Sequence, residues 1–82
     1  MTTVPDRVVR SAAAIGRAVK ARRHSLNLTQ DQLAERGITN RYAIMKIEEG
    51  VATRQLQTLL DILYALDLEL VVRPKGEGRE EG

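Results

Sequence analysis

Two helix-start signals lie eleven residues apart near the middle of the chain, and they constrain its fold more than any other feature. Thr29 is followed three residues later by Gln32, which is the spacing of a capping box. Asn40 is another preferred N-cap, and Gly37 between the two favours the end of a helix. The pattern predicts two short helices joined by a tight turn, over residues 30–36 and 41–49.

The second of these predicted helices has two different faces. At about 100° per residue, three apolar side chains gather on one side, namely Ala43, Ile44 and Ile47. The opposite side carries Tyr42, Met45, Lys46 and Glu49. We expect the apolar face to be buried in the fold. The other face would then be exposed and available to contact a partner.

Two further helices complete the predicted bundle. Ser11 is a suitable N-cap for a helix that ends near Asn27. Thr53 is a suitable cap for another helix, in which leucines recur at the spacing of a buried stripe: Leu56, Leu59, Leu60, Leu63 and Leu66. We therefore predict an all-α fold, a compact bundle of four to five helices, with the domain spanning residues 11–67.

The C-terminal part of the chain has a different pattern. After Asp67 the apolar period changes to two residues, which indicates a strand over residues 68–74. Nothing else in the sequence resembles a partner strand, so we expect pairing across a homodimer, with an extended tail as the alternative. The residues assigned to dimerisation are Leu68, Leu70, Val71 and Val72. We expect residues 1–10 to be a flexible arm and residues 75–82 a disordered tail.

The composition argues against several classes of site. The chain has no Cys and one His, so we expect no disulfide, no metal centre and no cofactor. It has no apolar run of membrane-spanning length and no apolar signal core, which favours a soluble cytoplasmic protein without a membrane partner. Residues 1–28 hold six Arg and Lys against one acid, which points to an anionic partner. A solvated basic surface is the alternative.

A helix presented by a tight turn can enter the major groove of DNA with its first residues at the base edges. Arg41 and Tyr42 are best placed to read bases, and Lys46, one turn later, can reach a base or a phosphate. Thr29 and Gln30 begin the preceding helix, where free backbone N–H groups favour a phosphate. An exposed face that only keeps the helix soluble is the alternative.

The stretch "ARRHSLNLTQDQLAERGITNRYAIMKIEEG" resembles the Xre/Cro/C1-type helix-turn-helix family, above all in "LTQDQLA" and "IMKIEEG". The resemblance covers about residues 15–70 and implies a lambda-repressor-like fold that binds double-stranded DNA. It places Gln30 beside a phosphate or a base, and it implies an ion pair between Arg23 and Glu48. For a DNA-bound chain, we assign the phosphate contacts to Thr29, Asn40, Arg17, Arg22 and Arg54.

The predicted turn departs from the family pattern in one respect. The family has Gly two residues before the N-cap, whereas Gly37 lies three residues before Asn40, and Ile38 and Thr39 fill the turn. This departure leaves the pitch of the second helix open.

The end of the chain, "LLDILYALDLELVVRPK", looks like the HipB-type antitoxins. That resemblance implies a terminal strand that pairs within a dimer, palindromic operators, and a HipA-type Ser/Thr kinase toxin as a second partner. Many solitary Xre regulators share part of this pattern.

Three functions remain open from the sequence. The favoured one is a dimeric repressor associated with the nucleoid, the antitoxin of a toxin–antitoxin operon. The others are a solitary Xre-family regulator and a protein-interaction module that does not bind DNA. We do not expect an enzyme, because His24 has no evident nucleophile beside it.

Overall fold

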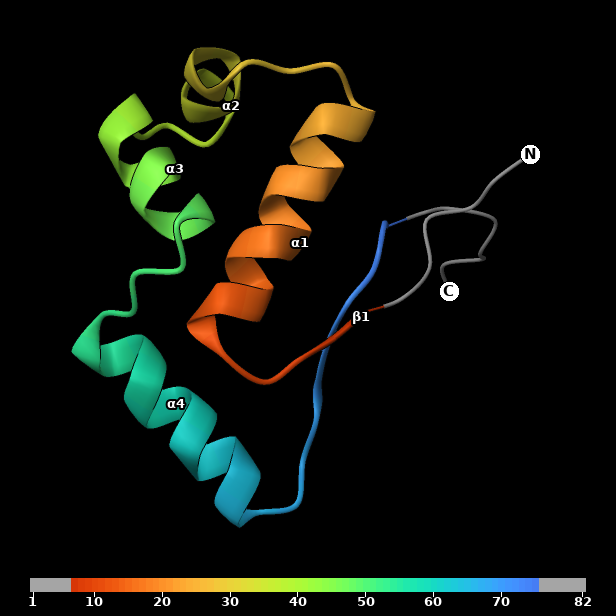
Figure 1. Cartoon of the computed structure of the whole chain (residues 1–82), viewed down its shortest axis with the longest axis vertical. Helices are drawn as coiled ribbons and strands as arrows, with labels where there is room; N and C mark the ends of the chain where they lie inside the picture. Colours follow the sequence, from red (N-terminus) through yellow and green to blue (C-terminus); the bar gives the residue numbers. More distant parts are fainter. Residues whose placement is uncertain (1–6, 76–82) are drawn as a thin grey trace.

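The computed structural model describes residues 7–75, which form a mostly helical fold with a small sheet (Figure 1). The elements in chain order are β1 (Arg7–Val9), α1 (Ala12–Ser25), α2 (Gln30–Arg36), α3 (Arg41–Glu48), α4 (Arg54–Ala65) and β2 (Leu70–Val72). None of the helices in this range has the length and apolar character that crossing a membrane requires.

Each of the four described helices begins at a side-chain cap. The capping residues are Ser11, Thr29, Asn40 and Thr53, and each accepts a hydrogen bond from the backbone N–H three residues further on. Thr29 and Gln32 form the complete capping box that the sequence predicts. The predicted starts of all four helices are therefore confirmed.

Helix α1 lies in the middle of the molecule, with α2 and α3 on one side and the sheet on the other (Figure 1). A Cβ atom at Gly16 would overlap the backbone carbonyl oxygens of Ile47 and Glu48. The glycine therefore allows α1 to lie directly against the end of α3. The buried apolar side chains are few and mostly small: Val9, Ala12, Ala18, Ala34, Ile44 and Leu60.

The turn between α2 and α3 contains a strained residue. Ile38 has a φ of 55°, in the left-handed region that costs a non-glycine residue about 1–2 kcal/mol, whereas Gly37 has an ordinary φ of −88°. Ile38 thus adopts the left-handed conformation two residues before the Asn40 cap, where the family pattern has Gly. Its side chain is 92% exposed, so no packing in the described chain offsets this strain.

The sheet overturns three predictions. Strand β1 pairs with β2 in antiparallel register, with Val9 opposite Leu70 and Arg7 opposite Val72. Residues 7–9 are therefore not part of a loose arm, and β2 has a partner strand within its own chain. Pairing with a second copy is not needed to satisfy this edge of β2, and the fold is not purely α-helical. Residues 1–6 of the predicted arm and 76–82 of the predicted tail lie outside the described residues.

Helix α4 does not bury the whole leucine stripe that its sequence suggests. Of that stripe only Leu60 is buried, whereas Leu59 is 47% exposed and Leu66 is 62% exposed. Ile62, which lies between these two along the helix, is 49% exposed. The helix therefore carries an apolar strip that residues 7–75 do not cover, and we call Leu59, Ile62 and Leu66 the outer strip.

Candidate nucleic-acid interface

A buried ion pair fixes the position of α3. Arg23 on α1 donates from Nε to Oε2 of Glu48 at 2.6 Å and from its second terminal nitrogen to Oε1 at 3.0 Å. The remaining terminal nitrogen donates to the carbonyl oxygen of Leu28 at 2.9 Å. The two charged side chains are 9% and 4% exposed. The predicted pair between Arg23 and Glu48 is therefore present, and it also ties down the segment that leads into α2.

The same contacts set the protonation of the carboxylate. The hydrogen bond from Arg23 holds the pKa of Glu48 below its ordinary range, and the bond from Gln30 adds to this, while burial opposes both. The Glu48 side chain is therefore an ionised hydrogen-bond acceptor at neutral pH.

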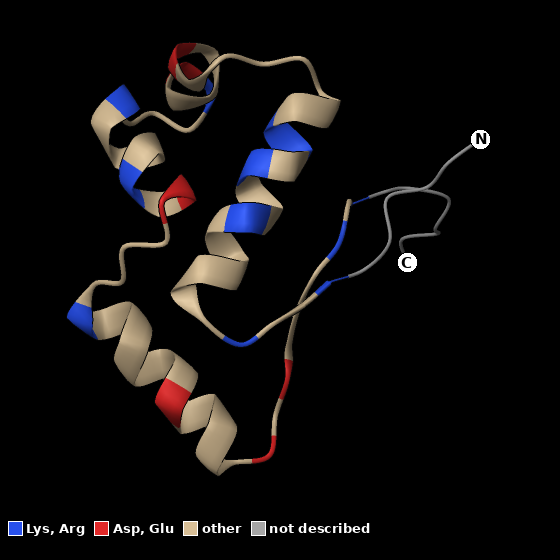
Figure 2. Cartoon of the chain, in the orientation of Figure 1, with Lys and Arg blue, Asp and Glu red and all other residues tan. Residues whose placement is uncertain are grey.

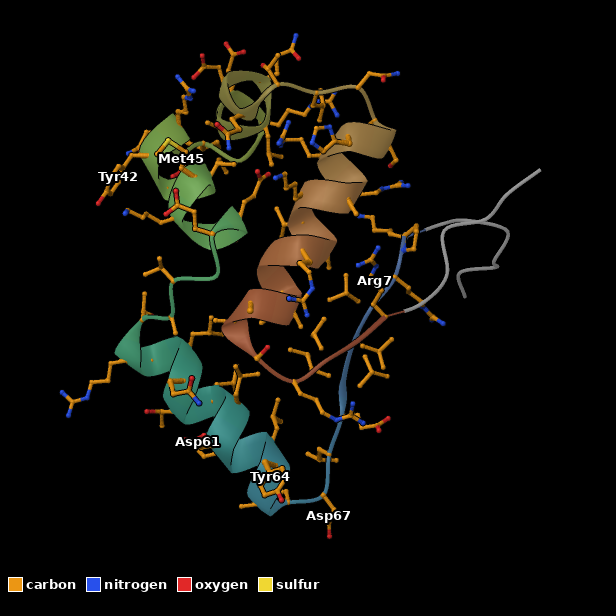
Figure 3. The ribbon with its side chains drawn as sticks, viewed as in Figure 1. Arg7, Tyr42, Met45, Asp61, Tyr64 and Asp67 are labelled. Atoms are coloured by element: carbon orange, nitrogen blue, oxygen red, sulfur yellow. The ribbon has the colours of Figure 1, made fainter. Side chains whose placement is uncertain are left out.

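The outer face of α3 presents the three side chains expected to read bases. Arg41 is the exposed first residue of the helix, and Tyr42 is 65% exposed. The Lys46 ammonium lies 5.3 Å from the centre of the Tyr42 ring, within range of a cation–π contact. Lys46 also lies 3.7 Å from a carboxylate oxygen of Glu49. Tyr42 points away from α1, as does Met45 on the next turn (Figure 3).

The start of α2 lies beside this face. Gln30 donates from Nε2 to Glu48 at 3.1 Å, and its carbonyl oxygen accepts from Nε of Arg41 at 3.3 Å. The side chains of Thr29 and Asn40 are engaged as helix caps, because each accepts a backbone N–H of its own helix. The structure therefore brings Gln30 and Arg41 into contact. The side-chain oxygens of Thr29 and Asn40 each already accept one hydrogen bond within the protein.

The remaining predicted phosphate contacts are not gathered at this face. Arg17 lines a shallow hollow with Arg7 and Val8 of β1, and Arg22 lines a groove between α1 and Val72 of β2. Both therefore lie toward the sheet rather than beside Arg41. Arg54 is the exposed first residue of α4, which is joined to the end of α3 by residues 49–53 and lies below α3 in the view of Figure 1.

Charges of both signs are spread over the described residues. Basic residues lie on α1, on α3, at the start of α4 and on the sheet, and acids lie on α2, at the end of α3, further along α4 and on the segment that leads into β2 (Figure 2). Helices α2 and α3 carry three acids and three basic residues, namely Asp31, Glu35 and Glu48 against Arg36, Arg41 and Lys46. The charge of these two helices does not by itself mark a surface for an anionic partner.

Two structural features have little or no signal in the sequence: the close contact at Gly16 and the bond between Gln30 and Glu48. Gly16 lies in the interior of α1, where Gly is less favourable than Ala by about 1 kcal/mol, and that unfavourable choice is the signal that could have identified a close helix contact. The bond between Gln30 and Glu48 has no local signal, because its partners are 18 residues apart in sequence.

Searches against protein-family models, curated proteins and solved structures found no match for this chain. A function for it is therefore argued from the geometry of the site.

The contribution of Glu48 to stability is expected to disappear in acid. The folded-state pKa of Glu48 lies below its ordinary value of 4.5, so the carboxylate stabilises the fold fully above pH 4.5. The stabilisation is lost as the pH falls below that value and through the lowered pKa. Glu48→Gln should therefore lower the free energy of unfolding by about 3–5 kcal/mol at pH 7, with a shrinking difference toward pH 2.5. Urea titrations of both proteins across this range measure the difference.

Glu49→Gln is the matched control for this measurement. Glu49 is exposed, and its ion pair within the described residues is the one with Lys46 at 3.7 Å, so its replacement should change the free energy of unfolding by about 0–1 kcal/mol at every pH. A difference between wild type and Glu48→Gln that stays constant from pH 7 to pH 2.5 would contradict the assignment.

Proposed function

We propose that this protein is a sequence-specific DNA-binding repressor that acts as a homodimer. The observation that carries the proposal is the division of α3 into two sides. On one side Ile44 is buried and Glu48 is bonded to Arg23, although Ile47 of the apolar face expected to be buried is 42% exposed. On the other side Arg41 and Tyr42 are exposed, and the Lys46 ammonium lies over the Tyr42 ring. A helix held on one side and furnished with base-reading side chains on the other is suited to the major groove.

The proposed docking mode follows from the residue types. Helices α2 and α3 with residues 37–40 between them would form a helix-turn-helix, and α3 would be the recognition helix. Arg41 can donate two hydrogen bonds to a guanine, and the Tyr42 ring can pack on a thymine methyl group. Lys46 can reach a base or a phosphate. The role of phosphate contact fits Arg54 better than Arg17 or Arg22, which lie toward the sheet.

The outer strip of α4 supports the homodimer. Leu59, Ile62 and Leu66 lie within about 60° of one another around the helix, and Leu68 just beyond it is 54% exposed. A strip of apolar side chains can pack on its own copy across a two-fold axis, which would bury apolar surface that residues 7–75 leave exposed. The same axis would place two copies of α3 on a palindromic operator.

The antitoxin role rests on the resemblance of the C-terminal stretch to HipB-type proteins. It would add a HipA-type kinase toxin to the partners of the DNA-binding dimer. A solitary regulator would have the same DNA interface, whereas a protein-interaction module would not need Arg41, Tyr42 and Lys46 on one exposed face. An adjacent, overlapping reading frame for a kinase-like toxin would support the antitoxin; its absence would favour the solitary regulator.

Arg41→Ala should reduce discrimination at one base pair by about 1–3 kcal/mol and leave the other positions of the operator unchanged. The reason is that Arg41 would bond a single guanine. The measurement is a gel-shift titration on the preferred duplex and on its single-base variants. Binding should weaken steeply with salt for wild type and variant alike, because phosphate contacts release counterions.

Arg36→Ala is the charge-matched control. Arg36 is exposed and is the last residue of α2, at the end of that helix opposite to Gln30. It should leave discrimination intact. Equal losses for Arg41→Ala on preferred and random DNA would refute base reading by Arg41, and affinity that is independent of salt would refute the phosphate contacts.

Ile62→Lys should convert the dimer to a monomer, because it would bury two like charges in the middle of the outer strip. Light scattering should then give the 9.1 kDa of one chain in place of twice that mass. Gln57→Lys places the same side chain on the polar side of α4, where Gln57 bonds Asp61, and should leave the dimer intact. A wild-type monomer, or an Ile62→Lys dimer, would show that this strip is not the interface.

A further inference from the structure

An apolar groove lies where α1 and α2 meet β2 (Figure 1). It has a volume of about 250 Å³ and is lined mainly by aliphatic side chains: Ile15, Val19, Leu26, Leu28, Leu33 and Val72. Leu26 is 45% exposed and Val72 is 39% exposed, so residues 7–75 leave part of this lining uncovered. We call the groove, together with the hollow that adjoins it, the α1–β2 groove.

One end of this groove is positively charged. The adjoining hollow has a volume of about 180 Å³, and Ala18, Arg22 and Val72 line both parts. Four basic residues line the hollow: Arg7, Arg22, Arg73 and Lys75. None of the described residues that line either part is acidic, and within residues 7–75 no carboxylate forms an ion pair with Arg7, Arg22 or Lys75. The groove therefore joins an aliphatic surface to a cluster of cations.

The lining favours a hydrocarbon chain over a peptide or a nucleobase. The side chains of Ile15, Val19 and Leu33 have no hydrogen-bonding group, so a peptide lying on them would leave its own N–H and C=O groups unpaired. No aromatic side chain of residues 7–75 lines either part, so a base would find no ring to stack on. An apolar cavity of about 150 Å³ is enough to hold a benzene molecule. The two adjoining parts therefore have room for a longer alkyl chain.

We propose that the α1–β2 groove binds a straight-chain amphipathic anion, a long-chain fatty acid in its carboxylate form. The alkyl chain would lie on the aliphatic side chains and be removed from water. The carboxylate would lie at the basic end, where the Arg22 guanidinium can donate two parallel hydrogen bonds to it. The groove shares no residue with the exposed face of α3 or with the outer strip of α4, so this inference does not depend on the DNA-binding function.

The probe is sodium dodecanoate, kept below its micelle concentration and titrated into the ¹⁵N-labelled full chain by NMR. The backbone amide signals of Val19, Leu26 and Val72 should shift most, and those of Tyr42 and Ile62 should stay in place. Across octanoate, decanoate and dodecanoate the dissociation constant should fall by about two- to fourfold for each CH₂ group added. Dodecyltrimethylammonium, which has the same chain and the opposite charge, should bind at least about tenfold more weakly than dodecanoate.

Val72→Asp should weaken dodecanoate binding by about tenfold or more, because it places a carboxylate in the groove. Val71→Asp is the matched control: neighbouring residues of a strand point to opposite faces, and Val71 is 47% exposed and lines neither part of the groove. It should leave binding unchanged.

Arg22→Gln gives the same test if Val72→Asp does not fold. It should weaken dodecanoate about tenfold and leave dodecyltrimethylammonium unchanged, because it removes one cation from the basic end. Arg36→Gln is its control, since Arg36 is exposed on α2 and lines neither part of the groove.

Three outcomes would overturn the proposal. Shifts centred on Leu59, Ile62 and Leu66 would mean that dodecanoate only coats the outer strip. Equal affinity for the two dodecyl ligands would mean that the basic end has no part in binding. No shift in wild type, together with a lower light-scattering mass for Val72→Asp than for Val71→Asp, would identify a second copy of the chain as the occupant of the groove.

Discussion

The bidentate bond between Arg23 and Glu48 determines how the candidate interface is presented. It joins α1 to the end of α3, and the third nitrogen of the same guanidinium holds the segment that leads into α2. A buried pair of this kind adds little net stability compared with a well-packed apolar alternative, but it is strongly unfavourable to separate. Rotation of α3 about its axis would separate the two charges. The outward direction of Arg41 and Tyr42 therefore depends on this pair.

The parts of the fold set by local interactions could be predicted from the sequence. Each helix start depends on a side chain and a backbone N–H three residues away, so the caps Thr29 and Asn40 can be predicted from the sequence. The sheet could not be predicted in the same way, because Val9 pairs with Leu70 across almost the whole described chain. A run of three residues carries too short a pattern to indicate a strand. The prediction that α4 buries its whole leucine stripe was wrong, because the apolar arc of this helix is wider than the surface that residues 7–75 cover, and periodicity does not say which part stays exposed.

The candidate site was predictable to a similar degree. A rotation of about 100° per residue separates Ile44 from Tyr42 and Lys46 without knowledge of the rest of the molecule. The ion pair of Arg23 and Glu48 came from a family resemblance, and no spacing rule would have revealed it. The bonds of Gln30 to Glu48 and Arg41 depend on the relative positions of α2 and α3. The left-handed φ of Ile38 could not be predicted either, because the glycine that would favour this conformation stands one residue earlier, at Gly37.

Together these features describe a small domain with two exposed surfaces, the outer face of α3, which is proposed to bind DNA, and the outer strip of α4, which is proposed to form the dimer. We propose that the exposed side of α3 reads the sequence of double-stranded DNA. The most direct test is selection of the purified full chain against a pool of random duplexes, followed by sequencing of the bound fraction. We expect enrichment of a palindromic site, because two copies of α3 would be related by a two-fold axis. A bound fraction with the same base composition at every position as the starting pool would contradict it.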